Sequence, residues 1–311
     1  MSSSNKRHAT TLRSEQGTVL EVSRRFVTVL TVGKRVVTGT ASSKSLEVVA
    51  GDEVTFEERD GEFFITDVAP SRRNLYRSSR GGVKRMGANI DALLVITAPG
   101  ATFNPVVVDR MLVAARVQAI PTTLVVNKSD LGLGDVESVL AVYERAGVPV
   151  LRTSAKRGDG MDEITAVVDR IGTRVVALCG VSGVGKSTIL NKLVPGAKTR
   201  TGELSERTGQ GKQTTSQPRG FLHTSSDARS TIIIDLPGVQ FFGLSHITSS
   251  EAAAAFPELV AASARCQFGD CKHLKEPVCG VREAVERGEI ATWRYDSYCQ
   301  ILQEIDEAKE Y

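Results

Sequence analysis

The sequence has few of the features that mark membrane, secreted or disulfide-stabilised proteins. No apolar run in its 311 residues approaches the roughly 20 residues that a membrane-spanning helix needs. Residues 1–8 lack the apolar core of a signal peptide and predict a disordered basic tail, which we extend to residue 13. Five cysteines, an odd number, argue against a disulfide framework. We therefore expect a soluble cytoplasmic protein with no membrane partner.

Net charge is also low, at +3, so the chain as a whole is not a polycation. The charge is unevenly spread, however, because residues 71–85 contain six basic side chains and no acid. These are Arg72, Arg73, Arg77, Arg80, Lys84 and Arg85. With Lys6, Arg7, Arg13, Arg24 and Arg25 upstream, the run indicates a face that binds nucleic-acid phosphates. A solvated linker between domains is the alternative.

The most informative stretch that is present matches the phosphate-binding P-loop, G-x-x-x-x-G-K-[ST]. Its residues are Gly180, Val181, Ser182, Gly183, Val184, Gly185, Lys186, Ser187 and Thr188. An apolar run suited to a buried strand precedes it, and a helix-forming run follows it. The glycines let backbone N–H groups face phosphate oxygens. Lys186 is expected on the β- and γ-phosphates, and the Ser187 hydroxyl on Mg²⁺.

Two further motifs favour guanine over adenine. Asn127-Lys128-Ser129-Asp130 follows an apolar run and fits N-K-x-D, whose carboxylate accepts hydrogen bonds from guanine N1–H and the 2-amino group. The stem of Lys128 can cover the base. Ser154-Ala155-Lys156 fits S-A-K, in which the Ala155 N–H meets guanine O6. Either motif alone could be an ordinary turn, but both end strand-like runs beside a P-loop.

The γ-phosphate elements are expected downstream. Asp235-Leu236-Pro237-Gly238 ends an apolar run and fits D-x-x-G, in which Asp235 holds Mg²⁺ and the Gly238 N–H senses the γ-phosphate. The polar segment 199–220 contains Thr214 and Thr215, either of which could close over Mg²⁺ in the triphosphate state. A solvated loop without a ligand is the alternative for this segment.

The order of these motifs predicts a circularly permuted GTPase domain. N-K-x-D and S-A-K precede the P-loop, whereas in ordinary small GTPases they follow D-x-x-G. Permutation moves the termini and leaves the packing unchanged. Strands alternating with helices predict an α/β domain with a mainly parallel sheet over residues 89–245. The chain after Gly238 is then joined directly to the γ-phosphate sensor.

Separate domains are expected on both sides. Residues 14–70 read as about five short strands, which fits a β-barrel of OB type, and residues 71–88 as a basic linker. Residues 246–311 read as a helical zinc-binding domain. Its ligands are expected to be Cys266, Cys271, His273 and Cys279. Three thiolates and one imidazole make a closed site, so we expect one structural Zn²⁺.

The chain resembles the RsgA-type circularly permuted GTPases of late small-subunit assembly. The resemblance rests on the permuted order, on D-x-P-G-V followed by Phe242-Gly243-Leu244, and on the C-x4-C-x-H-x5-C arrangement. It implies an OB-type barrel, binding of GTP and GDP, and contacts with the small ribosomal subunit and its rRNA. It also implies slow GTP hydrolysis that the subunit stimulates. A monomer is expected. The alternatives are an RNA-binding module with nucleotide as a structural ligand, and an ATPase.

The water-positioning group is the point where this chain departs from the family. Ras-like enzymes carry a glutamine just after D-x-x-G, but Val239 stands there. RsgA-type proteins usually carry a histidine before the switch threonines, and this chain has Gln213. We expect Gln213 to orient the attacking water, with Lys186, Thr214 and Thr215 completing the catalytic set. RNA, a threonine backbone group or a bound K⁺ are the alternatives.

Overall fold

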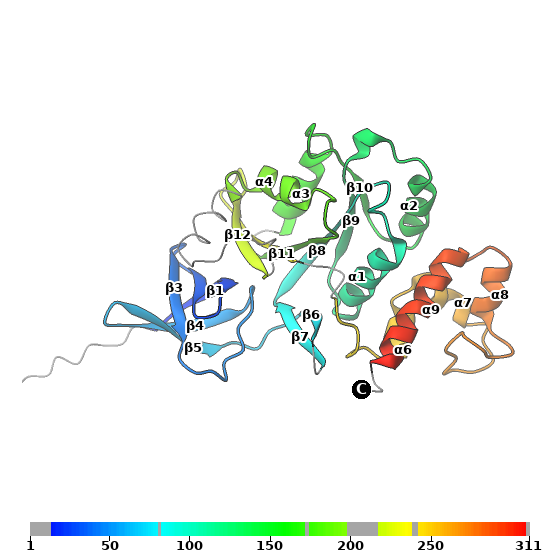
Figure 1. The fold of residues 1–311 in the computed structure, drawn as a ribbon, viewed down its shortest axis with the longest axis horizontal. Helices are drawn as coiled ribbons and strands as arrows, with labels where there is room; N and C mark the ends of the chain where they lie inside the picture. The colour runs from blue at the N-terminus through cyan, green and yellow to red at the C-terminus, as the bar shows by residue number, and fades with distance from the viewer. Residues whose placement is uncertain (1–13, 80–81, 172–173, 198–216, 238–241, 309–311) are drawn as a thin grey trace, which may run out of the picture.

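In a computed structural model, the chain forms an N-terminal barrel, a central α/β domain and a group of C-terminal helices (Figure 1). The structure describes residues 14–79, 82–171, 174–197, 217–237 and 242–308. Within these ranges, no helix is long and apolar enough to cross a membrane. The central domain lies between the other two parts in space, as it does in the sequence.

The barrel has the five short strands that the sequence predicts. They are β1 (Ser14–Val22), β2 (Val27–Thr31), β3 (Val36–Ala41), β4 (Glu53–Arg59) and β5 (Glu62–Val68). Pairing in the order β1-β2-β3-β5-β4 closes back onto β1, and only β3 and β5 are parallel. Alternate side chains fill the interior, among them Val29, Phe56 and Ile65. Closure leaves no free edge in this small sheet.

The central domain is the mainly parallel α/β domain expected from the sequence. Its strands are β8 (Ile90–Thr97), β9 (Thr122–Val126), β10 (Val150–Arg152), β11 (Val175–Gly180), β12 (Arg219–Thr224) and β13 (Ser230–Asp235). Its helices are α1 (Pro105–Val117), α2 (Val136–Arg145), α3 (Met161–Ile171) and α4 (Lys186–Leu193), with the 3-10 turn η1 (Ser129–Leu131). The strand order is β10-β9-β8-β11-β13-β12, and β12 alone is antiparallel to its neighbour in this domain.

Helices cover both faces of this sheet, as the side chains of β8 show. Leu93 and Val95 pack in the cluster that contains α1 and α2, whereas Leu94 and Ile96 pack in the cluster that contains α3 and α4. A strand buried on both faces reads as a continuous apolar run. The parallel strands β9, β10, β11 and β13 all end at one edge, and the predicted nucleotide motifs follow those ends.

The segment expected to be a basic linker contains a β-hairpin, formed by β6 (Leu75–Ser79) and β7 (Gly82–Gly87). The hairpin contacts the chain that follows D-x-x-G. Gly243 donates its N–H to the oxygen of Tyr76 at 3.1 Å, and the rings of Tyr76 and His246 lie 4.4 Å apart. The basic segment is therefore a folded part of the domain junction.

Two of its basic side chains serve the fold itself. Arg85 donates to the buried carboxylate of Asp52 at 2.8 Å, and Arg73 lies 3.2 Å from Asp91. Because these charges are already neutralised, the basic face available to nucleic acid is smaller than the sequence suggests.

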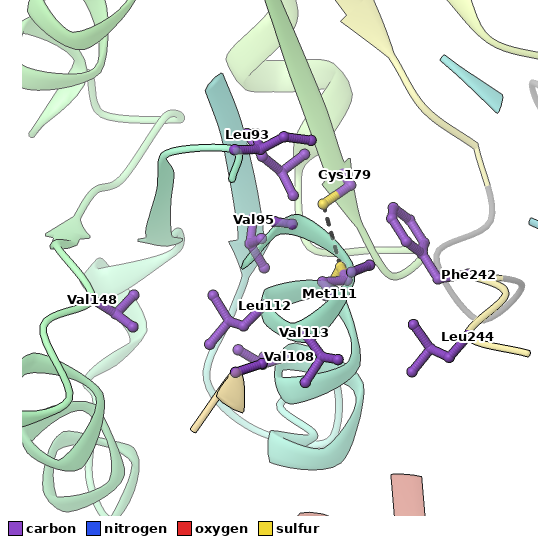
Figure 2. Close-up of a cluster of buried hydrophobic side chains, with 14 of the residues drawn as sticks. Leu93, Val95, Val108, Met111, Leu112, Val113, Val148, Cys179, Phe242 and Leu244 are labelled. Atoms are coloured by element: carbon purple, nitrogen blue, oxygen red, sulfur yellow. Dashed lines mark hydrogen bonds between the residues drawn. The ribbon is translucent and has the colours of Figure 1, made fainter. Parts of the chain in front are cut away.

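The chain after D-x-x-G returns at once to the core. Figure 2 shows Phe242 and Leu244 beside α1, with Phe242 close to Cys179 of β11 and Met111 of α1. The sulfur atoms of Cys179 and Met111 are 3.3 Å apart. Phe242 is 1% exposed. The backbone is thus anchored behind the P-loop strand only five residues beyond the described part of D-x-x-G.

The C-terminal helices are α6 (Ser249–Ala254), α7 (Pro257–Ser263), α8 (Gly280–Glu286) and α9 (Thr292–Glu307). They dock on α1 through a buried charge cluster. Arg294 of α9 binds Asp109 of α1 and Glu258 of α7, and its guanidinium lies 4.4 Å from the ring centre of Phe256. Tyr143 of α2 donates to the same Asp109 at 2.8 Å. A desolvated cluster of this kind holds the two parts in one orientation.

Candidate functional site

The P-loop connects β11 to α4 in the strand–loop–helix context that the motif requires. Gly183 and Gly185 have φ of 85° and 91°, in the left-handed region that favours glycine. At Gly185 space is limiting as well, since a Cβ would lie 2.3 Å from Asn127 Nδ2. The motif glycine therefore serves both the backbone turn and the approach of the loop that is predicted to bind guanine.

Asn127 joins the three motifs at the base end of the site. Its Nδ2 donates to the oxygen of Val184 at 2.8 Å, and its Oδ1 accepts from the N–H of Ala155 at 3.0 Å. The side chain is 3% exposed. Lys128 adds a second link, because its Nζ donates to the oxygen of Gly183 at 2.5 Å. Residues distant in the sequence thus meet at one hydrogen-bonded junction.

Asp130 is held as an ionised acceptor beside this junction. The Ser154 hydroxyl donates to Asp130 Oδ1 at 2.6 Å, and Arg157 Nε lies 3.8 Å from Oδ2. The hydrogen bond from Ser154 lowers the pKa of Asp130. Arg157 was not predicted from the sequence, although it directly follows S-A-K. A fixed carboxylate suits the paired N1–H and 2-amino donors of guanine.

The N–H of Ala155 is engaged differently from the expectation. It donates to Asn127, so a contact with guanine O6 would have to share this donor. The next N–H, that of Lys156, has no acceptor in the part of the chain that the structure describes. The N–H of Lys156 is therefore the donor of this motif that has no described acceptor.

At the phosphate end, Lys186 and Asp235 meet. Lys186 Nζ forms an ion pair with Asp235 Oδ1, and the two side chains are 15% and 7% exposed. Lys186 begins α4 and Asp235 ends β13, so the fold brings the P-loop lysine to the D-x-x-G carboxylate. Ser187, the next residue of α4, is on the same first turn. These three side chains offer one cation and two oxygen ligands to a magnesium triphosphate.

Four predicted residues of the site lie outside the described residues. They are Gln213, Thr214, Thr215 and Gly238. Their proposed contacts with water, Mg²⁺ and the γ-phosphate remain predictions.

The predicted zinc ligands form one compact cluster. The Sγ atoms of Cys266, Cys271 and Cys279 and a ring nitrogen of His273 all lie within 4.8 Å of one another. His273 Nδ1 is 3.5 Å from the sulfurs of both Cys266 and Cys279. Burial lowers the pKa of His273, which favours the neutral imidazole that binds metals. Three sulfurs and one nitrogen at this spacing fit a tetrahedral site without an open position.

The loop that carries the ligands is braced by residues that sequence reasoning did not single out. Glu276 accepts the backbone N–H groups of Lys272, Leu274 and Lys275 at 2.7–3.0 Å. Tyr295 of α9 donates to the oxygen of His273 at 2.6 Å. Such outer contacts orient the ligands themselves. The position of Glu276 between His273 and Cys279 was the only signal in the sequence.

A hollow of about 450 Å³ lies between the barrel and the β6–β7 hairpin. The basic side chains that line it are Arg24, Arg25, Lys44, Lys84 and Arg85. Arg85 is paired with Asp52, but the other four have no acidic partner among the described residues. Glu47 also lines the hollow. Phe26, beside the Arg24–Arg25 turn, is 45% exposed. Unpaired cations beside an exposed ring are typical of nucleic-acid contact.

Comparisons with known proteins agree on one family. The family model described as RsgA GTPase matches residues 68–245. The small ribosomal subunit biogenesis GTPase RsgA of Pseudomonas fluorescens is 38% identical over 261 residues, covering 82% of this chain and 74% of that protein. The protein of the same description from Haemophilus influenzae is 33% identical over 303 residues, covering 96% and 82%.

Solved structures agree on the fold. YjeQ from Thermotoga maritima superposes with a TM-score of 0.72 at 26% identity, covering 94% of this chain and 99% of that one. YloQ, described as a circularly permuted GTPase, gives 0.67 at 23% identity and covers 98% of both chains. The permuted architecture expected from the motif order is thereby confirmed.

Proposed function

Because this chain belongs to the RsgA GTPase family, we propose that it is a GTP-hydrolysing switch that binds the small ribosomal subunit and acts in its late assembly. The family relation and the names of the relatives support the ribosomal role. The observation that carries the nucleotide role is the junction at Asn127, which hydrogen-bonds N-K-x-D to both S-A-K and the P-loop.

In the proposed site, Asp130 and the Lys156 N–H select guanine, and the stem of Lys128 covers the base. Lys186 and the P-loop N–H groups from Gly183 onward neutralise and orient the phosphates. Ser187, Asp235 and Thr214 are the proposed ligands of Mg²⁺, which supplies charge neutralisation between the β- and γ-phosphates when bound. The Gly238 N–H would report the presence of the γ-phosphate.

Hydrolysis in this family of reactions depends mainly on position and charge. We assign the attacking water to Gln213, whose amide can both accept a hydrogen bond from water and donate one to it. Thr215 is the second hydroxyl available beside Thr214. Because glutamine does not titrate near neutral pH, turnover should lack the pH dependence that histidine would confer.

Contacts with rRNA are assigned to the barrel hollow and to the metal-bearing helical domain. Four cations in the hollow, which have no acidic partner among the described residues, suit a phosphate backbone. The Cys3His cluster is proposed to bind one structural Zn²⁺, which fixes the C-terminal domain but does no chemistry. Assembly of small subunits also implies that the protein works in the cytoplasm, and a monomer is proposed.

Cosedimentation tests the proposal directly. The chain should pellet with purified small subunits in the presence of a non-hydrolysable GTP analogue and much less with GDP, and it should not pellet with large subunits. An RNA-binding module that uses nucleotide only for structure would bind equally with GTP analogue and GDP. ATP should not compete for the nucleotide site. Competition by ATP at concentrations similar to those at which GTP competes would indicate an ATPase.

A further inference from the structure

A row of paired residues runs from the barrel to the nucleotide site. Glu21 of β1 pairs with Arg219 of β12, and Arg219 is directly opposite Asp235 of β13. Directly opposed residues on neighbouring strands project from the same face of a sheet. The next opposed pair, Phe221 and Ile233, packs in the cluster with α4. The row therefore lies on the face that carries Lys186.

The contact between β1 and β12 is close. A Cβ on Gly220 would lie 3.1 Å from the Cα, the Cδ2 and the oxygen of Leu20. Through this contact the barrel strands and the central strands form one continuous sheet of 11 strands. The strand β12 therefore lies between β1 and the strand that ends at Asp235.

Arg219 carries a nearly buried positive charge on the residue opposite Asp235, and its guanidinium is held by Glu21. Its side chain is 11% exposed, its Nε lies 3.0 Å from Glu21 Oε2, and its guanidinium carbon is 5.6 Å from the ring centre of Phe221. Opposed side chains begin about 5 Å apart, well within the reach of an arginine. A guanidinium that reaches a carboxylate competes with a divalent ion for that carboxylate.

We propose that Glu21 is a positioning residue for the magnesium end of the GTP site. By binding the Arg219 guanidinium, Glu21 neutralises it and holds it on the barrel side, so that Asp235 stays available to Mg²⁺ and Lys186. The inference rests on the proposed assignment of Asp235 to Mg²⁺. It makes the barrel, far from the guanine pocket in the sequence, a determinant of metal affinity.

The test is a Mg²⁺ titration of intrinsic GTP hydrolysis by the full-length protein. Glu21→Gln should raise the Mg²⁺ concentration for half-maximal turnover by about threefold or more, the size expected for loss of a partly exposed charge pair. Turnover at saturating Mg²⁺ should stay near wild type. Removing the freed charge in Glu21→Gln/Arg219→Gln should restore the half-maximal concentration to within about twofold of wild type.

A matched control comes from the other end of the same hairpin. Asp227 pairs with Arg229 at 2.6 Å on the surface, and Asp227→Asn should leave the Mg²⁺ requirement unchanged. Affinity for GDP in EDTA reports the integrity of the site without metal. It should be unchanged in Glu21→Gln, and its loss would make the pair merely structural and contradict the proposal.

Other outcomes distinguish the role of Glu21 from the assignment of Asp235 to Mg²⁺. A wild-type Mg²⁺ requirement in Glu21→Gln, while Asp235→Asn has a raised one, would overturn the role of Glu21 alone. A raised Mg²⁺ requirement that persists in the double variant would also overturn the role of Glu21 alone. An unchanged Mg²⁺ requirement in Asp235→Asn would overturn the assignment of Asp235 and the inference with it.

Discussion

Asn127 donates its side-chain amide to the backbone oxygen of Val184, 2.8 Å away, although 57 residues separate them in the chain. Val184 belongs to the loop that is proposed to hold the phosphates, and Asn127 begins the motif that is proposed to read the base. Because the buried amide also accepts from Ala155, the guanine end and the phosphate end of the site are fixed relative to each other. In the proposed site, the position of the base is therefore tied to the position of the phosphates.

Asp130→Asn should weaken GTP binding and favour xanthosine nucleotides. The amide can donate to the oxygen that replaces the guanine 2-amino group, whereas the ionised carboxylate cannot. The change in preference should be at least tenfold, or about 1.4 kcal/mol. Competition binding with GTP and XTP measures it, with Asp135→Asn as a control outside the pocket. Wild-type GTP affinity without any gain for XTP would show that Asp130 does not read the base.

The sequence predicted the strand ends and motifs of this site because each motif needs a fixed local context. It could not predict which partners the motif residues choose. The Ala155 N–H binds Asn127, and Arg85 neutralises Asp52, because strands far apart in the chain bring these groups together. The Asp109–Arg294 cluster was also invisible, since no local pattern marks an ion pair across 185 residues. Long-range pairing, not propensity, decides such contacts.

Stability should depend on the charge of Asp109. Burial raises its pKa to about 6 against the opposing effect of Arg294, and Glu258, Tyr143 and Arg116 also face the cluster. The folded state therefore binds this proton more tightly than the unfolded state. Its contribution to stability is full below about pH 4 and is lost as the pH rises through about 6.

Asp109→Asn removes this titration and keeps the shape of the side chain. The free energy of unfolding of the variant minus that of wild type should increase by about 1–2 kcal/mol as the pH rises from 4.5 to 6.5. Urea unfolding of both proteins across this range measures the difference. The contributions of other groups, which titrate in both proteins, cancel in that difference. A constant difference at all pH values would exclude Asp109 as the titrating group.

Cys271→Ser should lower bound zinc below one ion per chain. Loss of one thiolate from a Cys3His set weakens the metal site, and metal binding is coupled to folding of the loop. Elemental analysis gives the zinc content, and hydrogen exchange should increase in α8 and the ligand loop. Cys299→Ser, which lies outside the cluster, should behave as wild type. Full zinc occupancy in Cys271→Ser would remove Cys271 from the ligand set.

The barrel hollow should supply salt-dependent RNA affinity. Arg24→Gln combined with Lys44→Gln removes two of its unpaired charges. This variant should bind rRNA fragments more weakly and reduce the slope of log affinity against log salt by about 1.5. GTP affinity should not change. The matched control is Arg145→Gln/Arg170→Gln, which removes two exposed charges from α2 and α3. Equal salt slopes in the two variants would argue against RNA binding in the hollow.

Gln213→Ala should slow subunit-stimulated turnover. Loss of the water-positioning amide is expected to cost at least about tenfold in kcat, a barrier change near 1.4 kcal/mol, with little change in GTP affinity. Single-turnover hydrolysis with saturating small subunits isolates this step. Gln213→His should retain activity and introduce a pH dependence near 6.5. Stimulated turnover equal to wild type in Gln213→Ala would assign the water to another group.

The most direct test of the central claim is the rate of GTP turnover by the purified chain with and without purified small ribosomal subunits, at one salt concentration. We predict slow hydrolysis by the chain alone and a rate at least about tenfold higher with small subunits, a barrier reduction of about 1.4 kcal/mol. Large subunits should give no increase. Equal rates with and without small subunits would contradict the proposed subunit-responsive GTPase switch.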